Sequence, residues 1–300
     1  MHMQRSAVIV ADGGIDLPEG YADHYQIRMI PLMLSFGSEE LRSGIDISAA
    51  DFYQRLRVDP QHPTTSQPSA GDYVELYKEA AKAGLPILSF HLSAGLSGSI
   101  RSAQLAREML PELSITVVDT GTLSGAMGLQ VLVAADMASR GEPVEAIVAE
   151  VKRIGQESEM FFTLETIDYL RKGGRIGRVA GAVAGLLGIR PVITVDKSTG
   201  TYAPTGRVRS FKAGQAMVVD QIAAQAGEGA EISCIIMHGD CMPDVERFIE
   251  RLKARLNVKW IHIVRANPAL GVHVGPDTVG IAYYKGVLPI ADAGLAKVAE

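Results

Sequence analysis

Residues 93–99, Ser-Ala-Gly-Leu-Ser-Gly-Ser, combine hydroxyl side chains with glycines in a pattern that suits two chemistries. The apolar stretch at 85–92 predicts a strand before this run, and residues 100–110 predict a helix after it. The first N–H groups of a helix lack internal partners and carry partial positive charge, so such a turn suits a carboxylate or phosphate. The run also departs from the serine-hydrolase turn Gly-x-Ser-x-Gly only at Ser99. Ser97 is therefore an anion ligand, a nucleophile or a plain helix cap.

Three further segments carry polar groups suited to a ligand. Residues 63–69, Pro-Thr-Thr-Ser-Gln-Pro-Ser, hold hydroxyls and an amide that could extend a hydrogen-bond chain to a carboxylate; the alternative is a surface loop whose Ser69 caps a helix. Residues 171–178, Arg-Lys-Gly-Gly-Arg-Ile-Gly-Arg, suit bidentate recognition of a carboxylate or phosphate, or a helix C-cap, and lack the Walker pattern. His273, among glycines and a proline, is a candidate ligand contact or base.

Ser97, Asp119 and His273 follow one chain order known for catalytic triads. A triad also needs the serine beside the histidine and the histidine beside the acid, which chain order does not supply. Asp119 directly follows a predicted strand, and His273 lies in the other half of the chain. A serine hydrolase acting on acyl esters, with Ser97 as nucleophile, is therefore the alternative to an anion-binding site.

The charge is distributed unevenly along the chain. The 300 residues carry a formal net charge of −5, yet residues 171–212 hold nine Lys or Arg and one acid, Asp196. The acidic total argues against general nucleic-acid binding, whereas the basic segment indicates an anionic ligand, an acidic partner surface or a solvated face. With two cysteines the sequence cannot form a disulfide framework, so we expect a cytoplasmic protein without metal or cofactor.

No stretch of the sequence is long enough to span a bilayer. The longest apolar stretch, 180–189, has ten residues with three glycines, and a span needs about 20 residues. The polar residues 1–6 and the short apolar run after them do not form a signal core, so we expect no targeting segment.

Strands alternate with helices along the chain, which predicts an α/β fold. Because parallel sheets bind ligands beyond the carboxyl ends of their strands, Asp12, residues 93–99 and Asp119 should gather along one edge. In the first half we expect strands at 7–11, 27–36, 85–92 and 114–118, helices at 48–56, 72–83, 100–110, 123–139 and 144–158, and a loop at 61–71.

The second half of the chain is expected to form a separate unit. Its predicted strands are 160–164, 192–195, 202–204, 231–238, 259–264 and 279–284, and its predicted helices are 166–171, 178–187, 212–225 and 242–256. We therefore predict two α/β domains, residues 1–156 and residues 157–300, the first with a mostly parallel sheet flanked by helices.

Taken together, these motifs resemble the DegV family of bacterial fatty-acid-binding proteins over nearly the whole chain. No single motif is specific, but the set in this order and spacing is. The motifs that carry the resemblance are Asp12…Asp16-Leu17, Thr65-Ser66-Gln67-Pro68-Ser69, Leu96-Ser97-Gly98-Ser99, Val118-Asp119-Thr120, Tyr169-Leu170-Arg171-Lys172-Gly173-Gly174-Arg175-Ile176 and Gly271-Val272-His273-Val274-Gly275-Pro276.

The resemblance implies that a long-chain fatty acid lies between the two domains, with carboxylate-binding loops in the first and an apolar tail pocket in the second. It implies that Thr65 and Ser97 hold the carboxylate, with His273 nearby. Members of the family present the fatty acid to a separate ATP-dependent fatty-acid kinase, dihydroxyacetone-kinase-like, and are not themselves the catalyst. The resemblance also assigns residues around the head group, namely Ser66, Gly98 and Arg175, and residues of the partner-docking surface, namely Arg171, Arg175 and Arg207.

The chain departs from the family pattern at two turns. Gly13 and Gly14 stand where members usually have Ser and Thr, and residues 91–94 lack the usual serine pair. Neither change touches Thr65, Ser97 or His273. The tail lining is expected from 160–164, 180–189 and 232–237, although a plain core has the same pattern.

Overall fold

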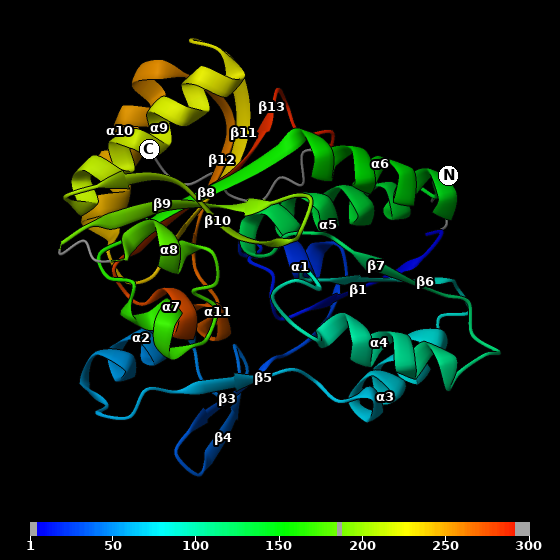
Figure 1. The fold of residues 1–300 in the computed structure, drawn as a ribbon. Coiled ribbons are helices and arrows are strands. Elements are labelled where there is room, and N and C mark those ends of the chain that lie inside the picture. The colour runs from blue at the N-terminus through cyan, green and yellow to red at the C-terminus, as the bar shows by residue number, and fades with distance from the viewer. Residues whose placement is uncertain (1–4, 185–187, 292–300) are drawn as a thin grey trace.

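Three β-sheets and the helices packed on them make up the computed structural model, which describes residues 5–184 and 188–291 (Figure 1). The first sheet has the strand order β2-β1-β6-β7, and all of its strands are parallel. Helices α3 and α4 cover one face, and α5 and α6 lie on the other (Figure 1). The predicted parallel sheet flanked by helices is thus confirmed. Its elements are β1 (Val8–Asp12), β2 (Arg28–Ile30), β6 (Ile87–His91), β7 (Ile115–Asp119), α3 (Ala70–Ala81), α4 (Ser99–Glu108), α5 (Ser124–Ser139) and α6 (Val144–Glu157).

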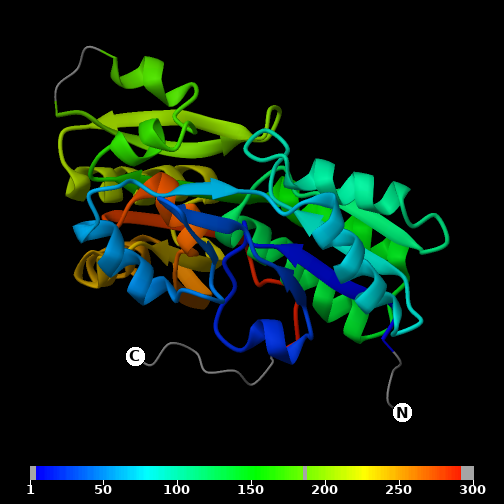
Figure 2. The same ribbon diagram turned by 90° about the horizontal axis from the view of Figure 1, so that it is seen from below.

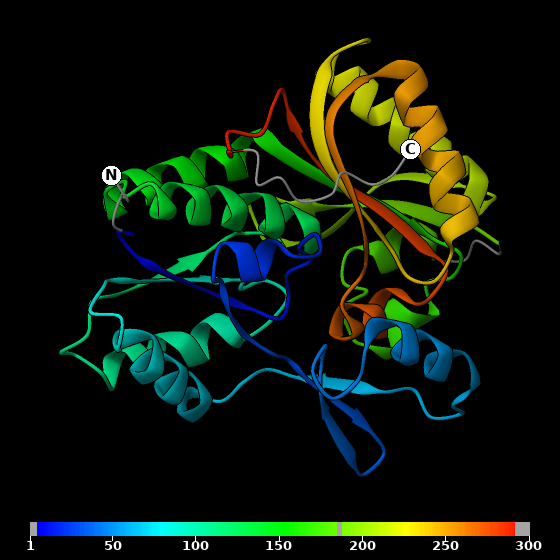
Figure 3. The same cartoon turned by 180° about the vertical axis from the view of Figure 1, so that it is seen from behind.

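The second sheet has the strand order β10-β9-β8-β13-β11-β12, and only the pair β11–β12 is parallel. Helices α9 and α10 cover the face turned away from α5 (Figure 3). We keep the domain boundary after residue 156, close to the junction of α6 and β8, as a proposal. The elements are β8 (Ser158–Leu164), β9 (Arg190–Asp196), β10 (Thr201–Val208), β11 (Glu231–His238), β12 (Asn257–Arg265), β13 (Thr278–Lys285), α9 (Phe211–Ala226) and α10 (Met242–Arg255).

Helix α5 lies between the two sheets and is buried nearly all round. A helix apolar on every side is stable only where it is packed on every side, and α5 contacts β1 on one side and β8, β11 and β13 on the other. Its glycines allow this close packing: a Cβ at Gly125 would lie 2.6 Å from Met237 Sδ, and one at Gly128 would collide with the Asp16 carbonyl oxygen. The two sheets therefore share one rigid helix.

A small third sheet was not predicted. Strands β3 (Met33–Phe36), β4 (Glu39–Arg42) and β5 (Thr64–Ser66) form an antiparallel sheet in the order β4-β3-β5, beside α2 (Ala49–Val58). In Figure 1 this sheet lies in blue below the two larger sheets, and in Figure 2, which is seen from below, its light-blue strand β5 lies in front of them. The prediction of one strand at 27–36 is wrong because Pro31 separates two strands that belong to different sheets. The loop predicted at 61–71 is wrong at β5, whose polar residues have no apolar pattern.

Helix α11 (Pro268–Val274), which was not predicted, carries His273. The Asn267 side chain accepts the Ala269 N–H at 3.0 Å, and Pro268 occupies the first turn, both of which favour a helix start. Gly275, at φ 79°, ends the helix. The short helix α1 (Tyr21–His24) was also not predicted.

Two helices precede β9 in the second half. Helix α7 (Asp168–Lys172) lies close to its predicted place, and α8 (Val179–Val183) is shorter than the helix predicted at 178–187. Residues 185–187 of that prediction lie outside the described residues. Within the described ranges, the structure has no helix that is both long enough and apolar enough to cross a membrane.

Candidate ligand-binding site

A cavity of about 310 Å³ lies where β5, α11, the 93–99 turn and the basic 171–178 turn meet. This volume is at the lower end of the range of about 300–1,000 Å³ that is common for ligand pockets. The side chains around it are hydroxyls, an amide, one guanidinium and one imidazole on a largely apolar wall: Leu32, Thr65, Ser66, Gln67, Leu92, Leu96, Ser97, Leu123, Arg175, Tyr202, Ala269, Leu270 and His273.

Thr65 and His273 meet across the cavity wall although 208 residues separate them in sequence. The Thr65 Oγ1 atom lies 3.0 Å from His273 Nε2, and which of the two donates depends on the tautomer of the ring. Burial, aided by the positive charge of Arg175 and by His62, lowers the pKa of His273 to about 3, while the nearby Gly173 backbone acts in the opposite direction. The ring is therefore neutral at neutral pH, and it offers the site a hydrogen bond rather than a charge.

Ser97 lies half-buried in the turn before α4 and lines the cavity. Its hydroxyl oxygen accepts the Ser99 N–H at 3.2 Å, so the serine caps the helix start, and its own O–H remains available to donate. Any side chain at Gly98 would collide with the Gln67 side chain, which in turn donates to Ser102 Oγ at 3.3 Å. Gly98 therefore lets the loop after β5 dock on α4 and does not itself line the cavity.

Arg175 supplies the positive charge of the site. Its guanidinium donates to the Leu96 carbonyl at 3.4 Å and to the Gly173 carbonyl at 3.0 Å, and it forms no ion pair with any described residue. No carboxylate of the described chain lines the cavity. A guanidinium without a carboxylate partner, beside hydroxyl donors and apolar walls, favours an anion with an apolar body.

The structure brings together most, but not all, of the residues that the sequence singled out. Thr65, Ser66, Ser97, Arg175 and His273 all line one cavity. Two arginines lie outside it on the surface: Arg171 pairs with Asp168, and Arg207 donates to the Ala182 carbonyl at 3.3 Å. Gly13 and Gly14 are likewise not among the residues around it; Gly14 packs against Leu92, where a Cβ would lie 2.7 Å from the Leu92 Cβ.

The hydrolase triad is not assembled. Among the described residues, no hydrogen bond joins Ser97 to His273, whose Nε2 atom faces Thr65 instead. Asp119 accepts the Ala94 and Gly121 N–H groups at 3.3 and 2.9 Å and lines a different cavity. Ser97 has no hydrogen-bonded histidine to take its proton, and His273 has no carboxylate to orient it, so the Ser97 oxygen is not activated in this arrangement.

A buried polar network behind the 93–99 turn was missed at the sequence level. Asp12 and His91 are both fully buried, with Asp12 Oδ2 lying 3.2 Å from His91 Nδ1, and His91 Nε2 lies 2.9 Å from Ser89 Oγ. Tyr73 joins this network to the start of α4, because its hydroxyl lies 2.7 Å from Ser99 Oγ. A signal was present, since Asp12 and His91 end neighbouring parallel strands, but Tyr73 and Ser99 come from the helices α3 and α4.

A second buried carboxylate fixes the helix that carries His273. Asp16 accepts the Ser124 hydroxyl at 2.5 Å and the Asn267 backbone N–H at 2.7 Å, just before α11 begins. Ser124 itself has a left-handed φ of 55°, a strained conformation for a non-glycine residue that these contacts help to hold. Burial raises the pKa of Asp16 to about 6, although both hydrogen bonds act in the opposite direction.

This raised pKa predicts a pH dependence of stability. The folded protein holds the Asp16 proton more tightly than the unfolded chain, where the carboxyl titrates near its ordinary value of 3.8. The resulting stabilisation is complete below the unfolded pKa and is lost as the pH rises through the folded pKa. Between about pH 4 and pH 7, the free energy of unfolding of the wild type should therefore fall by up to about 3 kcal/mol relative to Asp16→Asn.

Urea unfolding of both proteins across this range measures the difference. Asp23→Asn, which removes an exposed carboxylate, is the matched control and should show no such trend. A constant difference between the wild type and Asp16→Asn would mean that Asp16 titrates normally in the folded protein.

A smaller apolar space of about 30 Å³ adjoins this cavity. Leu123, Tyr202 and Leu270 line both spaces, and Met160, Phe162 and Met237 line the inner one. Residues of the segments 160–164 and 232–237 thus line an apolar space, and their contact with a fatty-acid tail stays a prediction. Among the described residues of 180–189, none lines either space.

The fold and this cavity define a two-domain α/β protein with a site suited to an amphipathic anion. The chain belongs to the DegV family: the model of that family, described as uncharacterised, matches residues 6–286. A DegV domain-containing protein of Deinococcus radiodurans is 38% identical over 284 residues, which cover 95% of this chain and 97% of that protein.

Solved structures show the same fold. A DegV family protein from Thermus thermophilus, described by its fatty acid binding, has a TM-score of 0.86 and 30% identity, covering 94% of this chain and 100% of the other. DegV from Bacillus subtilis, described as a fatty acid binding protein, has a TM-score of 0.84 and 26% identity with the same coverage.

Proposed function

We propose that this protein binds a long-chain fatty acid and holds its carboxylate between Thr65, Ser97 and Arg175, beside His273. The observation that carries the proposal is the Arg175 guanidinium, which lacks a carboxylate partner among the described residues and lines a cavity with an apolar interior. The fatty-acid binding of the family members from Thermus thermophilus and Bacillus subtilis supports it.

The two ends of the ligand contribute differently to binding. Donation from Arg175 and the hydroxyls of Thr65 and Ser97 orients the carboxylate, because charge-assisted hydrogen bonds are short and directional. Burial of the alkyl chain supplies most of the affinity, at about 0.8 kcal/mol for each methylene. Since His273 is neutral, it does not add charge; it holds the Thr65 hydroxyl in place.

We further propose that the protein is a non-catalytic cytoplasmic carrier that presents the carboxylate to a fatty-acid kinase. The absence of an assembled base at Ser97 in the described chain supports a role without catalysis. The exposed Arg171 and Arg207 lie outside the cavity and suit an acidic surface of the partner. Arg175 is the residue that belongs to both the head group and the docking surface in this proposal.

Extraction of the purified protein tests the binding function directly. Protein produced in a bacterial host should release a fatty acid into organic solvent in near-stoichiometric amount, which mass spectrometry identifies. The stripped protein should then bind added palmitate or oleate. Repeated extraction of ligand-free protein that also fails to bind either acid would overturn the proposal.

A further inference from the structure

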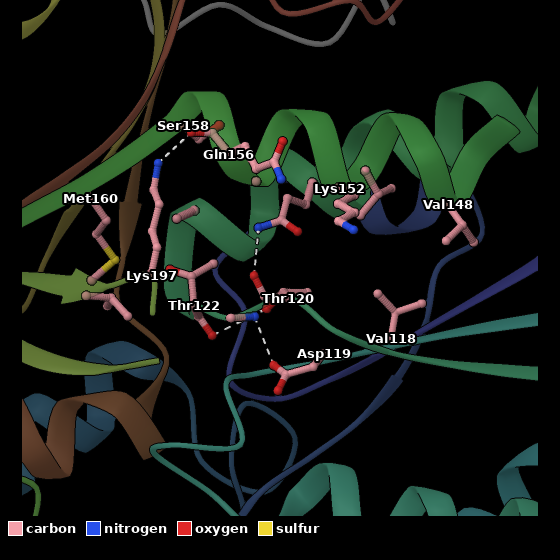
Figure 4. Close-up of a pocket in the computed structure, with 16 residues that line it drawn as sticks. Val118, Asp119, Thr120, Thr122, Val148, Lys152, Gln156, Ser158, Met160 and Lys197 are labelled. Carbon is pink, nitrogen blue, oxygen red and sulfur yellow. Dashed lines mark hydrogen bonds between the residues drawn. The ribbon is translucent and has the colours of Figure 1, made fainter. Parts of the chain in front are cut away.

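A second cavity, also of about 310 Å³, lies between the carboxyl end of β7, helices α5 and α6, and strands β8 and β9. Figure 4 shows side chains from these elements turned towards one space, with Lys152 and Gln156 from α6 above and Asp119 and Thr120 below. Much of its wall is apolar, as at Val118, Val148 and Met160, and polar side chains such as Lys152 and Gln156 line the rest. None of the residues around this cavity belongs to the head-group site described above.

The small inner space lies between the two cavities and shares lining residues with each. Met160 lines both the inner space and the second cavity, and Leu123 and Tyr202 line both the inner space and the head-group cavity. Met160 has an unbranched, flexible side chain, which adapts readily to a passing alkyl chain. A chain that enters at Arg175 would reach the second cavity by displacing the Met160 side chain.

Strand β8 forms one wall of this route. Successive side chains of a strand point to opposite faces, so Phe162, Met160 and Ser158 lie in a row on one face. Phe162 lines the inner space, Met160 lines the junction, and Ser158 lines the second cavity. At about 3.3 Å per residue, this row extends the route by about 13 Å.

The far end of this route carries polar side chains, which the binding of an alkyl chain does not require. Ser158 is 4% exposed, and its Oγ atom has no hydrogen-bond partner among the residues that the structure describes. Gln130, also buried, lines the same cavity and donates to the Thr120 carbonyl at 3.2 Å. Lys152 lines the rim without an ion pair in the described chain. A buried hydroxyl without a partner costs free energy, which a ligand group that hydrogen-bonds to it recovers.

We propose that the second cavity receives the distal end of the bound acyl chain and that Ser158 hydrogen-bonds a hydroxyl group there, so that the protein accepts ω-hydroxylated long-chain acids. This inference rests on the proposed fatty-acid function and names a substrate class for it. In a purely apolar tunnel, a terminal hydroxyl would lose its water without compensation and would weaken binding. Here the Ser158 hydroxyl compensates that loss.

Isothermal titration of the stripped protein with three acids tests this proposal. ω-Hydroxypalmitate is compared with heptadecanoate, which matches it in length, and with palmitate. The wild type should bind the hydroxy acid at least as tightly as heptadecanoate. Ser158→Ala should lower the affinity for ω-hydroxypalmitate relative to that for heptadecanoate about five- to tenfold. Ser158→Thr, which keeps a hydroxyl, should restore this relative affinity. Ser139→Ala, on α5 outside all three spaces, is the matched control.

The thermal midpoint provides a second readout. Because the Ser158 hydroxyl has no partner in the described chain, Ser158→Ala without ligand should melt no lower than the wild type. Tenfold discrimination of the wild type against the hydroxy acid, or an equal effect of Ser158→Ala on all three acids, would overturn the inference while leaving palmitate binding intact. Failure of palmitate itself to bind would instead overturn the proposed function.

Discussion

Palmitate should bind this protein about a hundredfold more tightly than laurate. The two acids present the same carboxylate to Arg175, Thr65 and Ser97, and they differ only by four methylenes. Those methylenes occupy the apolar space beyond Leu123 and Tyr202, where each contributes about 0.8 kcal/mol, or about 3 kcal/mol in all. Titration calorimetry of the stripped protein at one pH and ionic strength gives the two dissociation constants.

Each acid is kept below its critical micelle concentration, so that self-association does not compete with binding. Methyl palmitate, which has the same tail and no charge, separates the contribution of the head group. Equal affinities for laurate and palmitate would mean that the inner space beyond the first cavity does not receive the tail, and the route to the second cavity would be excluded with it.

Ser97→Ala should weaken palmitate binding about ten- to a hundredfold, because it removes a donor to a charged oxygen, a bond worth roughly 1.5–3 kcal/mol. Arg207→Ala should leave palmitate binding unchanged, since Arg207 lies outside the cavity, but should slow phosphorylation of the bound acid by a fatty-acid kinase. The two variants therefore distinguish binding of the fatty acid from its presentation to the kinase. Calorimetry measures the first, and acyl-phosphate formation with purified kinase measures the second.

Two observations would contradict this division of roles. Covalent labelling of Ser97 by a fluorophosphonate, together with turnover of an acyl ester that Ser97→Ala abolishes, would make Ser97 a nucleophile. Wild-type palmitate affinity in Ser97→Ala would remove it from the head-group site. Ser114→Ala, an exposed serine before β7, controls for the loss of a hydroxyl as such.

Sequence patterns alone predicted the order of most elements and singled out most of the candidate site residues. Strong apolar runs such as those of β6 and β11 predict strands because burial of their side chains is a local property of the sequence. Hydroxyls, glycines and arginines at 65, 97 and 171–178 also stand out locally, and their motifs resemble one family. The small sheet escaped prediction because β5 is short and polar, and only its pairing with β3 makes it a strand.

Only the tertiary structure decided which of these residues act together. It places Thr65 against His273, separates Asp119 into another cavity, and moves Arg171 and Arg207 to the surface. It also shows that Ser158 is a buried hydroxyl without a partner in the described chain, beside a cavity that shares Met160 with the apolar inner space. The physical reason is that hydrogen bonds and charge pairs act over a few ångströms between groups that chain folding brings from far apart, whereas sequence patterns report only what neighbours along the chain share.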